Sequence, residues 1–361
     1  MKNIVLMIDE LLGGGAQRST IKIATAFLNI GYDAHIIMMT NIIDFEIDSR
    51  LNIHCLNFEK GIVSSLSYIK YAKKLKRLLL KIDKESSISF MAGSLGLTHK
   101  LMDKAKLDDA YYMLRGTTSN AKIGDREGIR KSIKTKKVKK LYDNKNILCV
   151  SKGVEKDILS MGIIPKSIHT IYNPYDFDLI KELSLKNINF NIPEDEYLVH
   201  VGSFSQPKRH DILLKAFTKI KNKNIKLVLV GQGDEESNIK KFIKDLDIEQ
   251  RVVFAGFQSN PYPIIKGASL LLLSSDHEGL PTVIVEAYAL NVNVVSTDCP
   301  SGPYEIMAPE FEKYLSKVGD IEDFKNKIEL ALSDAKVKIP KSILKPFIVS
   351  NVIQQYERLF I

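Results

Sequence analysis

The chain has 361 residues, more than the ~100 to 200 residues of a usual domain, so two domains with separate cores are expected. Hydrophobic residues make up 45% and charged residues 26% of the chain, which excludes disordered and fibrous proteins. Apolar runs such as Leu270 to Leu273 fall far short of the ~20 residues that cross a bilayer. Three cysteines at spacings that fit neither a disulfide framework nor a zinc site favour a reducing cytosol.

Charge is unevenly distributed along the chain. Residues 1–172 contain 29 Lys and Arg against 17 Asp and Glu, a net charge of +12, whereas residues 173–361 contain 23 against 26, a net charge of −3. A composition bias of the whole proteome would raise both halves. The asymmetry therefore indicates that the first half meets an anionic partner, either nucleic acid or a membrane surface.

Short runs rich in Ile, Val and Leu alternate with amphipathic stretches along the chain, a pattern typical of parallel sheets flanked by helices. In the first half the predicted strands are 3–8, 33–39, 88–91, 110–114, 147–150 and 167–171. The same rhythm restarts in the second half with 197–202, 226–231, 251–256, 269–274 and 293–297. The polar stretch 173–193 is the predicted linker, and 345–361 is predicted as another amphipathic helix.

A glycine run, 13–15, separates the first predicted strand from a helix predicted to start at Ala16. Backbone amides and the positive end of a helix at such a turn can face an anion. The dinucleotide and P-loop glycine spacings are both absent, and such turns often serve only close backbone packing. An anion site and a packing role both stay open here.

Two adjacent cations, Lys208 and Arg209, precede the predicted helix 210–221. A cation at this end of a helix is unfavourable unless an anion lies between. Two solvated charges would explain the segment equally well.

Two carboxylates, Glu278 and Glu286, lie eight residues apart around a turn that contains Gly279 and Pro281. The first is predicted in the loop after a strand and the second about one turn inside a helix that begins near Thr282. Both could then bond the hydroxyls of a sugar or ribose while the amides of 279–282 take a phosphate. A capped helix with an ordinary Glu is the plainer alternative.

Taken together, these motifs resemble the retaining glycosyltransferases of the GT-B fold, within glycosyltransferase family 4. The resemblance includes the glycine loop 13–15, the strand and lysine at 202–208, the glycines that end strands at 231 and 256, the E-x7-E pair, and 171–177 as the entry to the second domain. It implies an α/β protein of two Rossmann-like domains facing across a cleft. The implied boundaries are an acceptor domain 1–172, a nucleotide-sugar domain 173–344, and a C-terminal helix 345–361 that crosses back to the N-terminal domain.

The resemblance also implies the site residues. Catalytic roles fall on Glu278, Lys208 and Arg209, and Arg115 and Arg18 lie on the acceptor or donor-sugar side. The implied nucleotide-sugar-binding set is Gly14, Gly15, Gly202, Ser203, Lys208, Arg209, Gly231, Phe257, Glu278, Gly279, Leu280, Pro281, Thr282 and Glu286.

Two departures from the family pattern concern the donor contacts. Ser203 stands where many relatives have Arg, so Arg209 beside Lys208 is expected to supply the second positive charge to the diphosphate. Arg115 stands where relatives often have a His. The histidines at 99, 200 and 210 are expected to be structural or surface residues, and Asp176 and Asp178 are interpreted as surface residues rather than a metal motif.

Two basic stretches, 66–82 and 126–143, carry apolar residues at helical spacing. The first has the stripe Ile69, Ala72, Leu75 and Leu79, and the second has eight cations within fifteen residues. Both resemble interfacial helices that rest on an anionic leaflet. The alternative is that the stripes pack on the sheet of the first domain while the lysines stay solvated.

The sequence therefore predicts a cytosolic enzyme, peripheral on the inner face of the membrane. It would transfer a hexose or N-acetylhexosamine from a UDP-sugar to a lipid-linked or polysaccharide acceptor of a bacterial surface glycan, with retention and without a metal or other cofactor. The alternatives are a nucleotide-sugar epimerase of GT-B architecture and a nucleic-acid-binding protein. The second lacks a recognised module and interleaved aromatic residues, so nucleic acid is not an expected partner.

Overall fold

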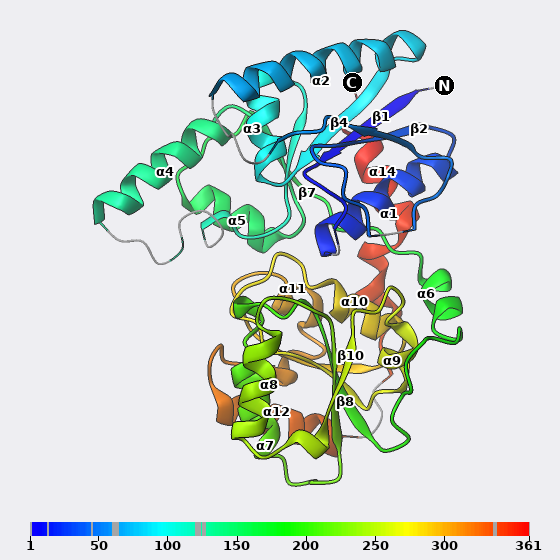
Figure 1. Ribbon diagram of the computed structural model, residues 1–361, viewed down its shortest axis with the longest axis vertical. Coiled ribbons are helices and arrows are strands. Elements are labelled where there is room, and N and C mark those ends of the chain that lie inside the picture. The colour runs from blue at the N-terminus through cyan, green and yellow to red at the C-terminus, as the bar shows by residue number, and fades with distance from the viewer. Residues whose placement is uncertain are drawn as a thin grey trace. The chain divides into compact units, whose positions relative to one another are not determined.

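The computed structural model describes residues 2–12, 14–44, 46–59, 65–119, 124, 128–334 and 338–360. These residues form two compact units, each a parallel sheet with helices packed on it (Figure 1). The first unit is Met1–Tyr175 with Phe347–Ile361, and the second is Asp176–Pro346. The α/β fold class is thereby confirmed.

The first unit contains a seven-stranded sheet with the order β3-β2-β1-β4-β5-β6-β7. Its strands are β1 (Asn3–Ile8), β2 (Asp33–Met38), β3 (Asn52–Cys55), β4 (Ile88–Ser94), β5 (Tyr111–Leu114), β6 (Asn146–Cys149) and β7 (Ser167–Thr170). Neighbouring strands pair in parallel, with Asn3 of β1 opposite Asp33 of β2. Sequence patterning missed β3, because this short edge strand alternates Asn52 and His54 with only one aliphatic residue.

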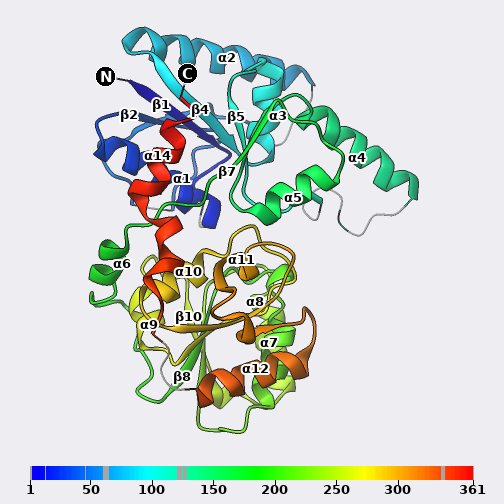
Figure 2. The ribbon, with the colours of Figure 1, turned by 180° about the vertical axis from the view of Figure 1, so that it is seen from behind.

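Helices cover both faces of this sheet. They are α1 (Gly15–Asn29), α2 (Ser65–Glu85), α3 (Gly96–Ala105), α4 (Gly128–Tyr142), α5 (Lys152–Ser160) and α14 (Val349–Glu357). Helix α14 lies beside α1 (Figure 2), and its Val352, Ile353 and Tyr356 join a core that includes Ile4 and Phe27. The chain thus returns to its first unit after the second, as predicted, because these apolar residues fill the core there.

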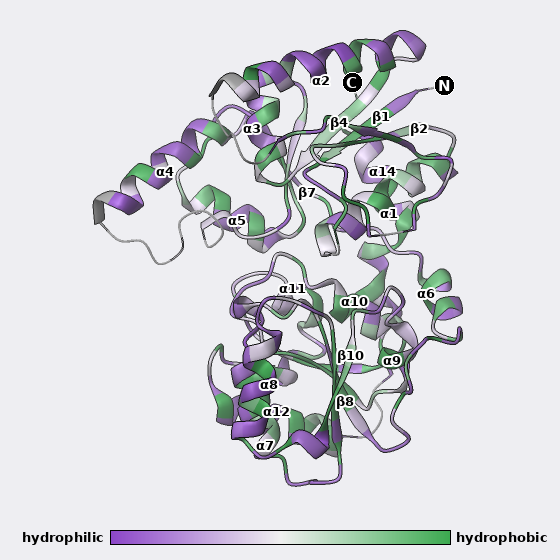
Figure 3. Cartoon of the chain, viewed as in Figure 1, coloured by the Kyte–Doolittle hydropathy of each residue, from purple (hydrophilic) through white to green (hydrophobic). Residues whose placement is uncertain are grey.

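The two basic helices differ in how they pack. In α2 the predicted stripe residues Ala72, Leu75 and Leu79 are buried in the core, while Ile69 is partly exposed. That stripe therefore follows the alternative of packing inward. In α4 Val138 is buried but Ile133 is exposed, as are most of the lysines, and Figure 3 shows α4 as largely hydrophilic. Among the described residues no helix is long and apolar enough to span a membrane.

The second unit contains a six-stranded parallel sheet with the order β10-β9-β8-β11-β12-β13. Its strands are β8 (Tyr197–Val201), β9 (Lys226–Val230), β10 (Val252–Gly256), β11 (Leu270–Leu273), β12 (Asn293–Thr297) and β13 (Leu315–Ser316). The α-helices are α6 (Phe177–Leu183), α7 (His210–Thr218), α8 (Glu236–Asp245), α9 (Tyr262–Gly267), α10 (Thr282–Ala289), α11 (Pro303–Met307), α12 (Ile321–Ser333) and α13 (Lys341–Leu344). Pattern reading missed β13, which has only two residues.

The predicted linker 173–193 is partly helical, because it contains α6. Asp176 caps this helix, and its Oδ1 accepts hydrogen bonds from the amides of Asp178 and Leu179 at 3.1 and 3.0 Å. Asp178 is exposed and pairs with Lys181 one turn on. Both carboxylates are thus accounted for by the helix that they begin.

Candidate active site

The second sheet has one topological switch point, between β8 and β11. The chain passes from β8 to β9 on one side, while β11 pairs with β8 on the other, so the loops that follow β8 and β11 leave in opposite directions. In open α/β sheets ligands bind beside the carboxyl ends of strands at such a point. Lys208 lies in the loop after β8, and Glu278 lies in the loop after β11.

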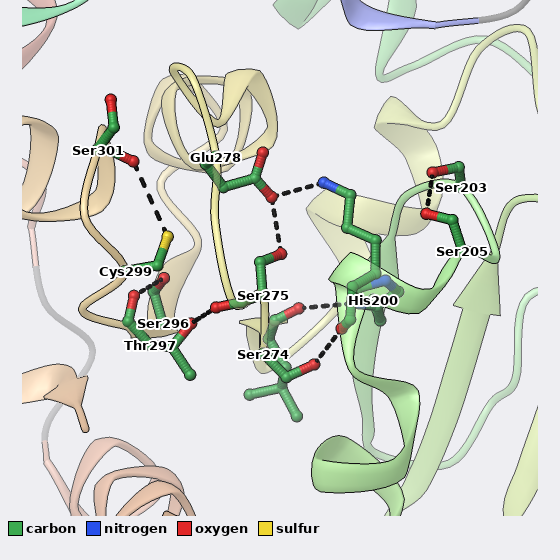
Figure 4. A network of polar contacts seen from close by, with 12 residues as sticks. His200, Ser203, Ser205, Ser274, Ser275, Glu278, Ser296, Thr297, Cys299 and Ser301 are labelled. Carbon is green, nitrogen blue, oxygen red and sulfur yellow. Dashed lines mark hydrogen bonds and ion pairs between the residues drawn. The ribbon is translucent and has the colours of Figure 1, made fainter. Parts of the chain in front are cut away.

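These two side chains meet although 70 residues separate them. Lys208 Nζ lies 2.5 Å from Glu278 Oε1, which also accepts a hydrogen bond of 2.7 Å from Ser275 Oγ (Figure 4). The two side chains are 21% and 12% exposed, so the pair is largely shielded but reaches solvent. Glu278 Oε2 has no hydrogen-bond partner among the described residues. The Glu278 carboxylate is therefore held in place through Oε1, and its Oε2 can accept a hydrogen bond from a ligand hydroxyl.

Hydrogen bonds to backbone carbonyls fix the two loops against each other. Ser274 Oγ donates to the carbonyl of Lys208 at 2.8 Å, and the amide of Asp276 donates to the carbonyl of Pro207 at 2.9 Å. On the other side, Thr297 Oγ1 donates to the carbonyl of Ser275 at 2.6 Å. The positions of Lys208 and Glu278 are thus set by the ends of three strands, β8, β11 and β12.

Arg209 has a different environment from its neighbour. Its Nε and Nη2 donate to Asp211 at 2.8 and 2.9 Å, and its Nη1 donates to both oxygens of Asp276 at 2.9 and 3.1 Å. Hydrogen bonding to Asp211 raises the pKa of Arg209 and lowers the pKa of Asp211. Asp211 and Asp276 of the same chain therefore supply the negative charge that was expected beside Arg209. Joint binding of a diphosphate by Lys208 and Arg209 stays a prediction.

Helix α10 begins beside Glu278. No side chain caps it, and Pro281 occupies its N-cap position. Ser301 Oγ donates to the carbonyl of Gly279 at 2.7 Å, and a Cβ on Gly302 would lie 2.3 Å from Pro281 Cδ. The loop after β12 therefore packs closely on this turn, which orients the helix start that the sequence predicted as a phosphate site.

Glu286 lies one turn inside α10 and is 4% exposed. The hydroxyl of Tyr262, the first residue of α9, is 3.4 Å from Glu286 Oε1. The two carboxylates of the E-x7-E pair thus have different surroundings, since Glu278 meets a cation and Glu286 meets a phenol.

Glycines bring the loops after β8 and β9 into close contact. A Cβ on Gly231 would lie 1.9 Å from the carbonyl oxygen of Gly202, and one on Gly233 would lie 2.4 Å from that of Phe204. In the loop after β8, Ser203 Oγ bonds Ser205 Oγ at 3.0 Å. Phe257, which directly follows β10, is 38% exposed. Gly231 is thus required by the approach of the two backbones.

Comparison with known proteins identifies this arrangement. Residues 184–343 match the family described as Glycosyl transferases group 1. Over 354 residues the chain is 27% identical to the N-acetylgalactosamine-N,N'-diacetylbacillosaminyl-diphospho-undecaprenol 4-alpha-N-acetylgalactosaminyltransferase of Campylobacter jejuni, a match that covers 94% of this chain and 92% of that protein. The lipopolysaccharide 1,6-galactosyltransferase of Salmonella typhimurium is 29% identical over 206 residues, which is 55% of each protein.

Solved structures share the fold over the whole chain. The structure of Anabaena HepE in complex with UDP-glucose superposes with a TM-score of 0.76 at 17% identity and covers 98% of both chains. The apo form of the lipopolysaccharide outer core galactosyltransferase WaaB superposes with a TM-score of 0.70 at 20% identity and covers 99% of this chain and 98% of that one. Residues 184–343 thus belong to the glycosyl transferases group 1, and the chain has the GT-B fold.

In the first unit of this glycosyltransferase, the predicted site residues follow the ends of strands. Gly14 precedes α1 and Gly15 begins it, with Arg18 within the first two turns, while Gly13 lies outside the described residues. Arg115 directly follows β5. The assignment of these residues to the acceptor or the donor sugar stays a prediction.

The three histidines expected to be structural or surface residues are all buried in the glycosyltransferase. His99 bonds the Tyr142 hydroxyl at 2.9 Å and the carbonyl of Gly93 at 2.8 Å. His200 and His210 form a pair with ring centroids 4.7 Å apart beneath the loop that carries Lys208. Burial favours the structural interpretation over a surface position for all three.

Sequence reasoning missed the residues that hold the site together. Ser275 and Asp276 lie in the loop after β11, where Ser275 bonds Glu278 and Asp276 bonds Arg209, and Tyr262 meets Glu286. The position of Ser275 and Asp276 in the sequence could have identified them, because polar residues at the carboxyl end of a parallel strand commonly line a ligand site.

Proposed function

We propose that this glycosyltransferase retains configuration when it transfers a hexose or N-acetylhexosamine from a UDP-sugar to a lipid-linked or polysaccharide acceptor of a bacterial surface glycan. The observation that carries the proposal is the Lys208–Glu278 pair at the switch point of the second sheet. Support for the acceptor class comes from the relatives in Campylobacter and Salmonella, which act on a diphospho-undecaprenol-linked saccharide and on lipopolysaccharide.

In the proposed reaction the bond between the anomeric carbon and the β-phosphate oxygen breaks. Lys208, Arg209 and the amide end of α10 stabilise the charge that develops on the leaving diphosphate. The acceptor hydroxyl attacks the anomeric carbon from the face that the diphosphate leaves, and its proton passes to a phosphate oxygen. Glu278 Oε2 accepts a hydrogen bond from a hydroxyl of the transferred sugar, and Glu286 bonds the ribose.

Because these cationic groups supply the positive charge, the proposal needs no metal ion. Chelation with EDTA is then expected to leave the transfer rate unchanged. A loss of transfer that added Mg²⁺ or Mn²⁺ restores would contradict this part of the proposal.

We further propose that α4 holds the enzyme on an anionic membrane surface at the inner face. Within Gly128–Tyr142 there are seven Lys and Arg and no acidic residue, and none of the seven forms an ion pair with a described residue. Each such cation contributes about 1 kcal/mol near an anionic leaflet. Since the α2 stripe is largely buried, attachment through electrostatic attraction rather than apolar insertion is the mode that the exposed residues favour.

The test is a panel of nucleotide sugars screened by thermal unfolding. A ligand at ~100 times its Kd adds ~2.7 kcal/mol to the free energy of unfolding. We expect UDP-sugars to raise Tm, and NMR of the transferred sugar to show the anomeric configuration of the donor. If no nucleotide sugar raises Tm, or the product is inverted, the proposal is wrong.

A further inference from the structure

Arg115 carries a positive charge that meets only neutral groups. Its Nε donates to Ser94 Oγ at 3.3 Å, its Nη1 donates to Asn173 Oδ1 at 2.8 Å, and its Nη2 contacts Met113 Sδ at 3.7 Å. No carboxylate among the described residues forms an ion pair with it. A guanidinium has five N–H donors, so two stay available after these three contacts.

Arg115 and its partners Ser94 and Asn173 lie at the ends of three strands of the first sheet. Ser94 is the last residue of β4, Arg115 follows β5, and Asn173 follows β7. Parallel strands place these ends at one edge of the sheet, the edge at which α/β proteins bind ligands. Ser94 and Asn173 are buried, whereas Arg115 is only partly buried and reaches solvent. The guanidinium is thus held in one orientation at this edge of the sheet.

A cation in this position is costly for the protein alone. Removing a charge from water without a counter-ion is strongly unfavourable, and burial lowers the pKa of Arg115 accordingly. Lys208, Arg209 and Arg50 each have a carboxylate partner. A neutral glutamine could tie the three strand ends together at lower cost, so a purely structural role does not explain the choice of arginine.

We propose that Arg115, oriented by Ser94 and Asn173, is a phosphate-binding subsite in the first unit. A planar guanidinium suits phosphate oxygens, which it can bind through two parallel N–H donors. The phosphate belongs either to the diphosphate of a lipid-linked acceptor or to that of the nucleotide donor. The inference rests on the proposed function only for the identity of these two sources.

The test measures binding of inorganic pyrophosphate to the full chain by calorimetry, in a Lys208→Ala background that weakens the other cationic site. Arg115→Gln is expected to weaken binding at least tenfold, and Arg115→Lys to weaken it less. Arg50→Gln is the matched control, because Arg50 is an exposed arginine that pairs with Asp48, and it is expected to leave binding unchanged. Equal pyrophosphate affinity of the Arg115→Gln variant and its parent overturns the proposal.

Two further probes distinguish the sources of the phosphate. If Arg115→Gln weakens binding of farnesyl diphosphate but not of UDP, the phosphate belongs to the acceptor, and the reverse result assigns it to the donor. Should Arg115→Gln fail to fold by circular dichroism, Arg115→Lys is compared with its parent, and an unchanged pyrophosphate Kd then overturns the proposal. Arg115-dependent binding in a protein that transfers no sugar would leave this inference standing and contradict the proposed function instead.

Discussion

The two units treat their functional cations in opposite ways. In the second unit Lys208 and Arg209 are neutralised by Glu278, Asp211 and Asp276 of the same chain. In the first unit Arg115 meets only neutral partners, and the cations of α4 form no ion pair with described residues. Each cation of the second site therefore has a carboxylate partner before a ligand arrives, whereas the first unit retains charge that an external anion can neutralise. If Arg115 binds phosphate and α4 binds an anionic membrane, as proposed above, the uneven charge of the two halves has a functional cause rather than a compositional one.

The largest effect is expected from removing both cations of the second unit. Lys208→Ala with Arg209→Ala should abolish transfer, since no side-chain cation of the β8 loop would then face the leaving diphosphate. Circular dichroism should show a folded protein. Lys208→Ala alone is expected to account for most of the loss, because Arg209 is already bonded by two carboxylates. Normal transfer by the double variant would show that Lys208 and Arg209 take no part in the reaction.

The matching test in the first unit reverses the charge of α4. Replacing Lys136, Lys137, Lys139 and Lys140 by Glu should abolish co-sedimentation with anionic liposomes, since about 1 kcal/mol is lost for each lysine. Binding of the unchanged protein should also weaken with salt, because screening shortens to ~3 Å at 1 M. Equal pelleting with neutral lipid, or no pelleting of the unchanged protein, would refute the membrane assignment.

A smaller effect is expected from the carboxylates of the second unit. Glu278→Ala should mainly lower kcat and Glu286→Ala mainly weaken nucleotide binding, each by the ~1.5 to 3 kcal/mol of a hydrogen bond to a charged group. Kinetics and calorimetry with the best UDP-sugar measure the two effects separately. Wild-type rate and affinity in both variants would remove the site assignment.

The smallest effect is expected on the stability of the fold in acid. Each unit contains a pair of neighbouring histidines. In the second unit burial lowers the pKa of His200 to about 4 and also lowers that of His210. The unfolded chain therefore binds protons first as pH falls below 6.5, and stability is lost with falling pH, by about 0.8 kcal/mol for His200 between pH 7.5 and 6. His210→Phe should reduce this loss in urea titrations, since His210 Nε2 has no hydrogen-bond partner among the described residues.

The first unit provides the comparison for that experiment. His35 Nδ1 lies 3.0 Å from His54 Nε2, and burial lowers the pKa of both rings. Because this pair shares a hydrogen bond, His35→Phe should also lower stability at neutral pH, unlike His210→Phe. A neutral-pH loss of the same size in both variants would show that the two pairs do not differ.

The sequence was sufficient for the fold because buried parallel strands are continuous apolar runs, such as Leu270–Leu273 of β11. It was insufficient where one pattern serves two environments. The α2 stripe has the spacing of an interfacial helix and of a core helix alike, and only packing shows that Leu75 and Leu79 face inward.

The sequence indicated candidate residues of the site but not the contacts between them. Lys208 and Glu278 could each be identified from a motif, yet their ion pair depends on β8 lying beside β11, which is a property of strand order. Of the two carboxylates that bond Arg209, Asp211 is close in sequence, but Asp276 comes from the distant loop after β11, and Arg115 has no carboxylate partner among the described residues. Counter-ions contributed by distant segments decide what each cation can bind.

The return of α14 to the first unit has a consequence for synthesis on the ribosome. Val352, Ile353 and Tyr356 complete a core whose other residues precede Tyr175, and the whole of Asp176–Pro346 is translated in between. At about 5 to 20 residues per second, the first unit waits roughly 10 to 35 s with part of its core uncovered. The second unit is continuous in sequence and needs no later segment. The half of the enzyme that is made first is thus the half that finishes folding last.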